Sequence, residues 1–165
     1  MIERQFLDSA LAELRKLKEQ ADKAAAQVSD EQFAALIDPE ANSIALIMKH
    51  VAGNMRSRWT DFLTSDGEKP NRERDREFEA ERADTRAAVV DGWNRAWTLT
   101  LDTIAALQPS DVSRTVRIRG EEMTALQAIH RQLTHYAAHV GQIVLLAKHH
   151  AGDRWQTLSI PKKRR

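Results

Sequence analysis

Four stretches of this chain repeat apolar residues at intervals of three and four, and no other feature constrains its fold as strongly. Such spacing places the apolar side chains on one side of an α-helix and the charged side chains on the other. We expect long helices over residues 2–28, 43–62, 89–107 and 124–152. Helices of this length bury their apolar sides by packing on one another, so the sequence predicts an all-α fold and, within that class, a four-helix bundle.

The connections between these helices are long, and two of them have a pattern of their own. Residues 71–86 are rich in both acidic and basic side chains around a single apolar anchor, Phe78, and we interpret them as a solvated connection with some helix. Before the last helix, Val116 and Ile118 alternate with arginines, which predicts a short extended segment. The length fits one domain, and we assign residues 1–160 to it and residues 161–165 to a basic C-terminal tail.

The charge balance and the absence of cysteine limit the chemistry that the chain can perform. Lys and Arg number 25 against 24 Asp and Glu, so no strong overall field attracts nucleic acid or an anionic membrane. The N-terminal run lacks the apolar centre of a signal peptide and no apolar stretch approaches ~20 residues, so we expect a cytoplasmic protein without a membrane span. Without cysteine, any thiol chemistry must use a thiol from another molecule.

Two histidines on the last expected helix form half of a candidate metal site. His135 and His139 are four residues apart in the run LTHYAAHVGQIV, so both imidazoles project from one side of the helix. His50 lies in the second expected helix, in the run SIALIMKHVAGNM. If these two helices pack side by side, three imidazoles can hold a divalent ion and leave positions for water or substrate. Tyr136 stands where the HExxH motif of metalloproteases has glutamate, which argues against a peptidase of that kind.

The histidine spacing also has a plainer explanation, since pairs four residues apart occur by chance on many helices, with rings that are only hydrogen-bonded or exposed. His130 points nearly opposite to His139 on the same helix, and we interpret it as structural. His149 and His150 fall at the helix C-terminus, where a positive charge complements the helix dipole. Only His50, His135 and His139 therefore remain candidates for metal binding.

Other residues with possible binding roles have ordinary structural interpretations. Three tryptophans occupy apolar helix positions, where packing in the core is expected; they are Trp59, Trp93 and Trp97. Four arginines flank the turn-like run SDGEKP; they are Arg56, Arg58, Arg72 and Arg74. Arginines at the mouth of a cavity can hold a carboxylate or phosphate, but for these we favour solvated surface charge.

Three segments of the chain carry a resemblance to a known family: KHVAGNMRSRWTDFLTSDGEKPNRERDREFE, AIHRQLTHYAAHVGQIVLLAKHHAG and WQTLSIP. Over nearly its whole length the sequence resembles the DinB/YfiT-like superfamily, most closely its branch of uncharacterised bacterial proteins. The resemblance implies a four-helix bundle, often homodimeric, that holds a divalent metal ion with one histidine of the second helix and two of the fourth. On this chain these ligands are His50, His135 and His139. Met123 departs from the pattern, because a histidine often follows the Arg-Gly-Glu run in this branch.

The resemblance also implies candidate activities on a small-molecule substrate. The first is an S-transferase that uses mycothiol, bacillithiol or glutathione, in which the metal ion favours the thiolate of this low-molecular-weight thiol. The second is a metal-dependent hydrolase, which needs a proton acceptor. Asn54 and Gln142 are not strong bases, and Asp61 lies about two helical turns beyond Asn54, so we rank hydrolysis second.

A third alternative is a metal-binding or dimeric scaffold without catalytic activity, which the sequence does not exclude. Imidazole ligands suit zinc, nickel, iron and copper. We expect zinc or nickel first, with iron or copper as alternatives.

Overall fold

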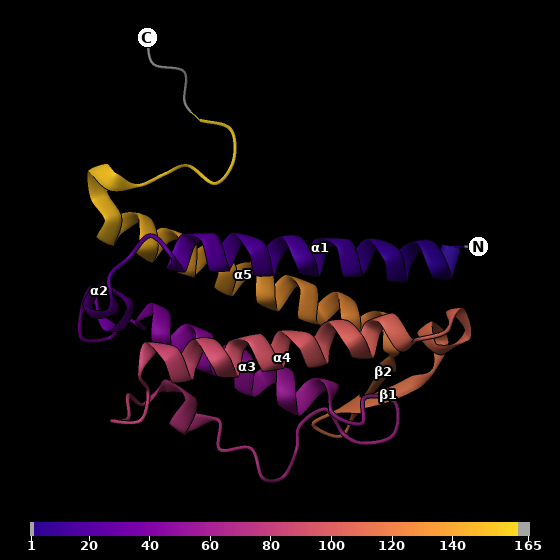
Figure 1. Cartoon of the computed structure of the whole chain (residues 1–165). Coiled ribbons are helices and arrows are strands. Elements are labelled where there is room, and N and C mark those ends of the chain that lie inside the picture. Colours follow the sequence, from indigo (N-terminus) through magenta and orange to yellow (C-terminus); the bar gives the residue numbers. More distant parts are fainter. Residues whose placement is uncertain (1, 162–165) are drawn as a thin grey trace.

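The computed structural model describes residues 2–161, and within them the protein is mostly helical, with five α-helices and one small two-stranded sheet. The prediction of an all-α fold is confirmed at this level (Figure 1). In chain order the α-helices and strands are α1 (Ile2–Ala25), α2 (Asp30–Ala34), α3 (Ile44–Trp59), α4 (Arg86–Ala106), β1 (Thr115–Ile118), β2 (Glu121–Thr124) and α5 (Ala125–Ala151).

The ends of the long helices follow from local sequence chemistry. Ser43 caps α3 by accepting a hydrogen bond from a backbone amide of the first turn. Thr124 and Gln127 form a reciprocal capping box at the start of α5, as their spacing predicts. α3 ends at Trp59, a few residues earlier than its apolar pattern suggests, because Asp61 adopts a φ of 50° and leaves the helical conformation.

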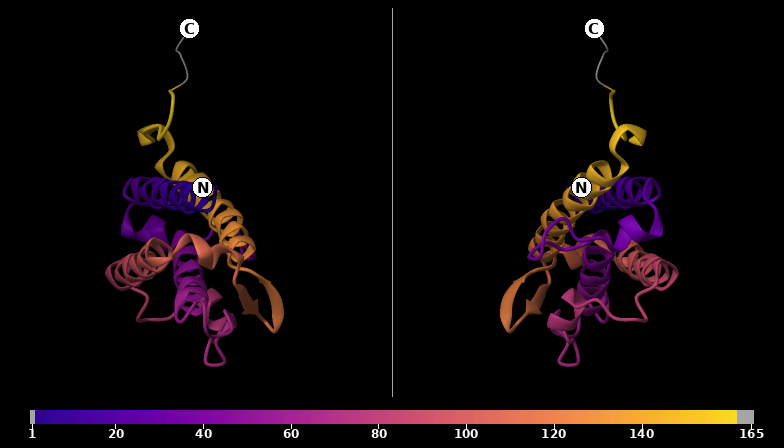
Figure 2. Two further views of the ribbon diagram at one scale, coloured as in Figure 1. Left: turned by 90° about the vertical axis from the view of Figure 1, so that its right-hand side faces the viewer. Right: turned by 90° about the vertical axis from the view of Figure 1, so that its left-hand side faces the viewer.

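The four long helices surround one core. α1 packs most extensively against α5, and α3 against α4, while α1–α4 and α3–α5 contacts connect the two pairs. Figure 2 shows this arrangement from both ends of the helices. The core is rich in aromatic side chains, and its largest fully buried members include Trp59, Trp93, Trp97, Tyr136 and Phe33. The structural role expected for the three tryptophans is therefore confirmed.

The expected extended segment before the last helix is the first strand of a hairpin. β1 pairs with β2 in antiparallel register, and Arg119 and Gly120 form the turn between them, both with positive φ. Two such residues are typical of the tight turns that join antiparallel strands. The carboxylate of Asp66 accepts hydrogen bonds from the backbone amides of both turn residues, which ties the hairpin to the loop that follows α3.

The connection between α3 and α4 differs in part from the solvated segment that its charges suggest. Its residues 75–78 form a short 3-10 helix that packs against α3. Glu77 in this turn is only 7% exposed, and Lys49 of α3 donates hydrogen bonds to the connection at Glu79 and Asp84. The interpretation as a solvated connection with some helix agrees with most of residues 71–86, which are exposed, and is wrong for Arg72 and Glu77, whose side chains are buried because they pair with each other.

In the range 2–161 no helix combines the length and the hydropathy that a bilayer crossing requires. Of the expected basic tail, residues 161–165, the last four lie outside the described residues. The assignment of residues 1–160 to one domain stays a prediction, as does the homodimer.

Candidate metal centre

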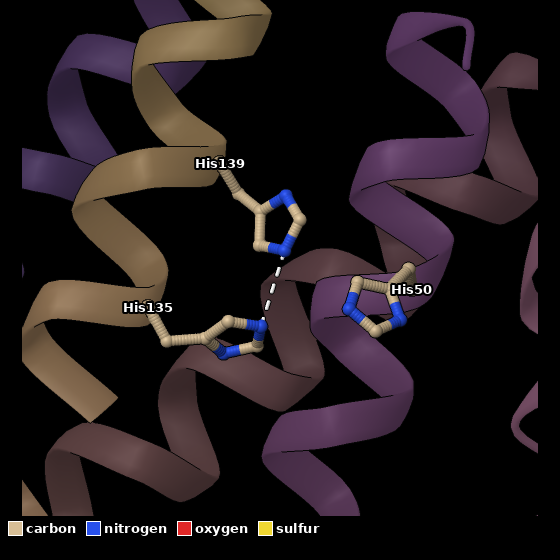
Figure 3. A group of neighbouring side chains, drawn as sticks. All are labelled: His50, His135 and His139. Carbon is tan, nitrogen blue, oxygen red and sulfur yellow. Dashed lines mark hydrogen bonds between the residues drawn. The ribbon is translucent and has the colours of Figure 1, made fainter. Parts of the chain in front are cut away.

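Three histidines from two helices converge on one point beside the core. His50 comes from α3, and His135 and His139 come from successive turns of α5 (Figure 3). Their ring centroids are separated by 4.7 to 5.6 Å, and one ring nitrogen from each lies within 4.8 Å of the others. The expected convergence of these three residues is confirmed. Whether they bind a metal ion stays a prediction.

A carboxylate orients the first of these rings. Nδ1 of His50 lies 2.9 Å from Oε2 of Glu77. A carboxylate only accepts hydrogen bonds, so Nδ1 carries the proton and Nε2 keeps its lone pair. Phe78 stacks on the same imidazole with a centroid separation of 4.4 Å. A carboxylate behind a histidine is the usual outer partner of a metal ligand, because it selects the tautomer and raises the basicity of the free nitrogen.

Glu77 is itself held by a second charged residue. Arg72 donates from Nε to Oε1 at 2.8 Å and from Nη2 to Oε2 at 2.7 Å, a bidentate pair. Burial alone would raise the pKa of Glu77, but the hydrogen bonds from Arg72 and His50 outweigh it and hold the pKa below its usual value. The carboxylate is therefore ionised at neutral pH.

The close approach of Glu77 to α3 depends on Gly53. A β-carbon built at this glycine would stand 2.1 Å from Oε1 and 2.6 Å from Cδ of Glu77, so any side chain there would displace the carboxylate. The glycine lies one turn from His50 on the same helix. Its small size therefore lets the connecting segment place an acidic group directly behind the histidine.

Of the two histidines of α5, only His139 has an outer partner of this kind. Nδ1 of His139 lies 2.7 Å from Oε1 of Gln142, an acceptor, so its Nε2 carries the lone pair. This nitrogen accepts a hydrogen bond from Nε2 of His135 at 3.1 Å (Figure 3). Nδ1 of His135 is buried and has no hydrogen-bond partner in the described part of the chain.

Burial keeps both rings of α5 neutral. Desolvation, followed by the charges of His139 and His50, lowers the pKa of His135 from its ordinary 6.5 to about 4. Desolvation also lowers the pKa of His139, although its hydrogen bond to Gln142 opposes the effect. Neutral imidazoles are the form that binds metal ions.

The donor set fits a divalent cation. Imidazole nitrogens bind zinc at about 2.0–2.1 Å, so two ligands of one ion are at most about 4.2 Å apart. The 3.1 Å between Nε2 of His135 and Nε2 of His139 lies within this limit. One ring nitrogen of His50 lies within 4.8 Å of a nitrogen of each of the other two rings. A small movement of the His50 ring therefore brings all three nitrogens within binding distance of one ion. All three candidate ligand atoms are imidazole nitrogens, which suit zinc, nickel, copper and iron.

A cavity of about 200 Å³ opens beside the histidines. His50 and His135 form part of its wall, and five arginines form much of the rest; they are Arg58, Arg72, Arg74, Arg119 and Arg131. Of the four arginines expected to be solvated, Arg58 is only 5% exposed and the side chain of Arg72 likewise 5%, so that expectation is wrong for these two. Both are buried because they pair with Glu68, and Arg72 also with Glu77.

The remaining histidines lie outside this group. His130 is exposed on α5, in agreement with the orientation expected from the helical spacing. His149 and His150 stack edge to face on each other at the end of α5, with ring centroids 5.3 Å apart. Neither set joins the three-histidine cluster.

Sequence reasoning missed the outer partners on the connecting segment, Glu77 and Arg72. One signal was present: Phe78 is the only large apolar residue in a long charged run, and such a residue marks where the run attaches to the core. The residue beside this anchor is the one that reaches His50.

Comparison with known proteins gives a family match for this chain. No curated protein matches the chain. The family model described as "Protein of unknown function (DUF1572)" matches residues 1–164, essentially the whole chain. With three histidines brought together from α3 and α5 and a match of this extent, the chain belongs to the DUF1572 family, which lies within the DinB/YfiT-like superfamily.

Proposed function

We propose that this protein is a metal-dependent S-transferase that binds a divalent ion, zinc or nickel before iron or copper, on a four-helix-bundle scaffold. His50 and His139 would hold the ion through Nε2, and His135 would do so once its proton moves from Nε2 to Nδ1, which has no hydrogen-bond partner among the described residues. The observation that carries the proposal is the pair of preset tautomers: Nδ1 of His50 faces Glu77, and Nδ1 of His139 faces Gln142, so two free nitrogens point at one place.

Three protein ligands would leave at least one coordination position for water or substrate, as in reactive rather than structural metal sites. When bound, a divalent ion supplies a Lewis acid that lowers the pKa of a thiol or of water. The chain's own residues set up this chemistry by keeping His135 and His139 neutral through burial, and by fixing the direction of His50 through Glu77 and of His139 through Gln142.

The cavity wall favours thiol transfer over hydrolysis. Hydrolysis calls for a carboxylate or similar base beside the attacking water, and no carboxylate lines the cavity next to the histidines. Asp61 lines a different cavity, and Glu77 is committed to His50 and Arg72. A thiol ionises more readily and needs no such base. It forms a carbon–sulfur bond, its proton goes to solvent, and the leaving group takes the electron pair.

The thiol must come from a second molecule, because the chain has no cysteine. From the family resemblance we include in the proposal a low-molecular-weight thiol as co-substrate, a small-molecule electrophile as substrate and a homodimeric assembly. The alternatives are a hydrolase and a non-enzymatic metal-binding scaffold, and the following experiment distinguishes both from the S-transferase.

The test compares product formation from a chromogenic chloronitroarene by metal-loaded protein with glutathione, bacillithiol or mycothiol. We expect turnover that requires both metal and thiol, that His135→Ala abolishes and that His130→Ala leaves unchanged. Equal rates in the His135→Ala variant, or turnover without any thiol, would contradict the proposal. Metal that raises the melting temperature while every thiol and ester screen stays blank would instead favour the scaffold.

A further inference from the structure

The cavity beside the histidines carries more positive charge than its surroundings neutralise. Five arginines line it, and four carboxylates lie against them: Asp66, Glu68, Asp75 and Glu77. One positive charge is therefore uncompensated before a divalent ion adds two more. Burial would raise the pKa values of Glu68 and Glu77, but hydrogen bonds and neighbouring arginines outweigh it and hold them below their usual range. Both carboxylates are therefore counted as negatively charged at neutral pH.

Arg131 accounts for the uncompensated charge. Its side chain lines the cavity from α5, one turn before His135, and it is exposed. No hydrogen bond or ion pair joins its guanidinium to another residue in the described range 2–161. Arg119 of the hairpin turn lines the same cavity, and in the described range only one nitrogen of its guanidinium forms a hydrogen bond, with Glu68 at 3.1 Å. Several N–H donors of Arg119 and Arg131 are therefore without a protein partner in the described range.

The buried end of the cavity also has hydrogen-bonding capacity to spare. Nε of Arg58 is buried and has no partner among the described residues, although its terminal nitrogens bond to Gly67 and Glu68. Gln132, which lines the same cavity, is 3% exposed, and its Oε1 also has no partner among the described residues; as an acceptor it suits a water molecule or a hydroxyl group rather than an anion. Buried polar groups usually find partners, and unpaired ones mark places where a ligand or water completes the network.

We propose that this cavity holds an anionic group of the substrate, a carboxylate or a phosphoryl group, between Arg119 and Arg131 and beside the three histidines. The inference rests on the proposed metal centre, because the cavity shares His50 and His135 with it. Guanidinium groups bind both kinds of anion in a planar, bidentate manner. At about 200 Å³ the cavity is smaller than most ligand pockets, so it receives a charged group of a few atoms and leaves the rest of the molecule outside.

The arrangement assigns a role in substrate selection to the hairpin. Asp66 accepts hydrogen bonds from both turn amides and thereby sets the position of Arg119 at the opening. An anionic group bound there would stand next to the open positions of the metal centre. Electrophiles that carry a carboxylate or phosphate should therefore react faster than neutral ones of equal intrinsic reactivity.

Calorimetric titration of malonate and of inorganic phosphate into the full-length protein tests this inference, once with zinc bound and once after treatment with a chelator. The variant is Arg131→Gln, which removes an exposed guanidinium without an internal partner. Arg15→Gln is the matched control, since Arg15 is likewise exposed on a long helix and its guanidinium forms no hydrogen bond or ion pair within residues 2–161. Zinc content is measured separately for each protein.

We expect both anions to bind the wild-type protein and the control equally, and Arg131→Gln to weaken binding about tenfold with or without zinc. A stronger effect for malonate indicates a carboxylate substrate, and a stronger effect for phosphate a phosphoryl group. Equal affinities of Arg131→Gln and wild type, or no binding to either form of the wild type, would overturn the inference. Arginine-dependent binding in a protein that takes up no zinc would support the anion site and contradict the proposed function.

Discussion

Gly53 lies in the interior of α3, where helix propensity and the position of Glu77 make opposite predictions for a change to alanine. Propensity alone favours alanine by about 1 kcal/mol. The added β-carbon, however, would stand 2.1 Å from Oε1 of Glu77, whereas real contacts of this kind are no shorter than 3.0 Å. The carboxylate must then retreat by about 0.9 Å, which breaks or stretches its bonds to Arg72 and His50.

Hydrogen bonds to charged groups contribute about 1.5–3 kcal/mol each. Loss of one or two of them outweighs the gain in propensity, so we expect Gly53→Ala to destabilise the metal-free protein by roughly 1–3 kcal/mol. Because His50 loses its outer partner, metal affinity should also fall about 10- to 100-fold although every ligand is intact.

Urea denaturation of chelator-treated protein measures the first effect, and competition with a chelating dye measures the second. Gly92→Ala is the control, since Gly92 lies inside α4 with open space around its Cα, and it should be stabilising by up to about 1 kcal/mol. If Gly53→Ala stabilises the protein as Gly92→Ala does and binds metal as tightly as the wild type, the carboxylate of Glu77 does not orient His50.

Three further predictions concern acid stability, a buried hydrogen-bond chain and assembly. The pKa of His135 falls from 6.5 to about 4 on folding, so between these pH values the unfolded state binds more protons, and the metal-free protein should lose stability as pH drops from 6.5 towards 4. Urea denaturation at several pH values measures this loss. The free energy of unfolding should depend less steeply on pH in His135→Gln than in the wild type, and an equal pH dependence would refute the assignment to His135. Tyr136→Phe leaves buried Nε1 of Trp59 without an acceptor and should cost about 2 kcal/mol in the same assay, with little change in metal affinity. Light scattering should give twice the 18.7 kDa chain mass for the proposed homodimer, and a monomer would remove that part of the proposal.

Much of the helical structure can be predicted from the sequence because its determinants are local. Apolar spacing marks the four long helices, and the Thr124–Gln127 capping box sets the start of α5. The pairing of His135 with His139 follows from the helical repeat alone. The contact of His50 with these two histidines depends on residues far apart in the sequence. It could be predicted only by assuming that α3 packs against α5 or from the family resemblance.

The outer partners of the histidines depend on contacts that no local pattern contains. Glu77 lies in a run of charges that reads as solvated, and it becomes buried only because Gly53 leaves room and Arg72 supplies a counter-charge. The second strand, Glu121–Thr124, has no alternation of apolar residues, so its pairing with β1 was not visible either. In both cases one segment takes its structure from another that is distant in sequence.

The most direct measurement of the central claim is the zinc or nickel content of gently purified protein, before and after reloading, for the wild type, His135→Ala and His130→Ala. His130 is the matched control because it is exposed on the same helix, outside the cluster. We predict close to one ion per chain in the wild type and in His130→Ala, and little in His135→Ala. Wild-type protein that takes up no ion after reloading, or equal metal in the two variants, would contradict a metal centre built on His50, His135 and His139.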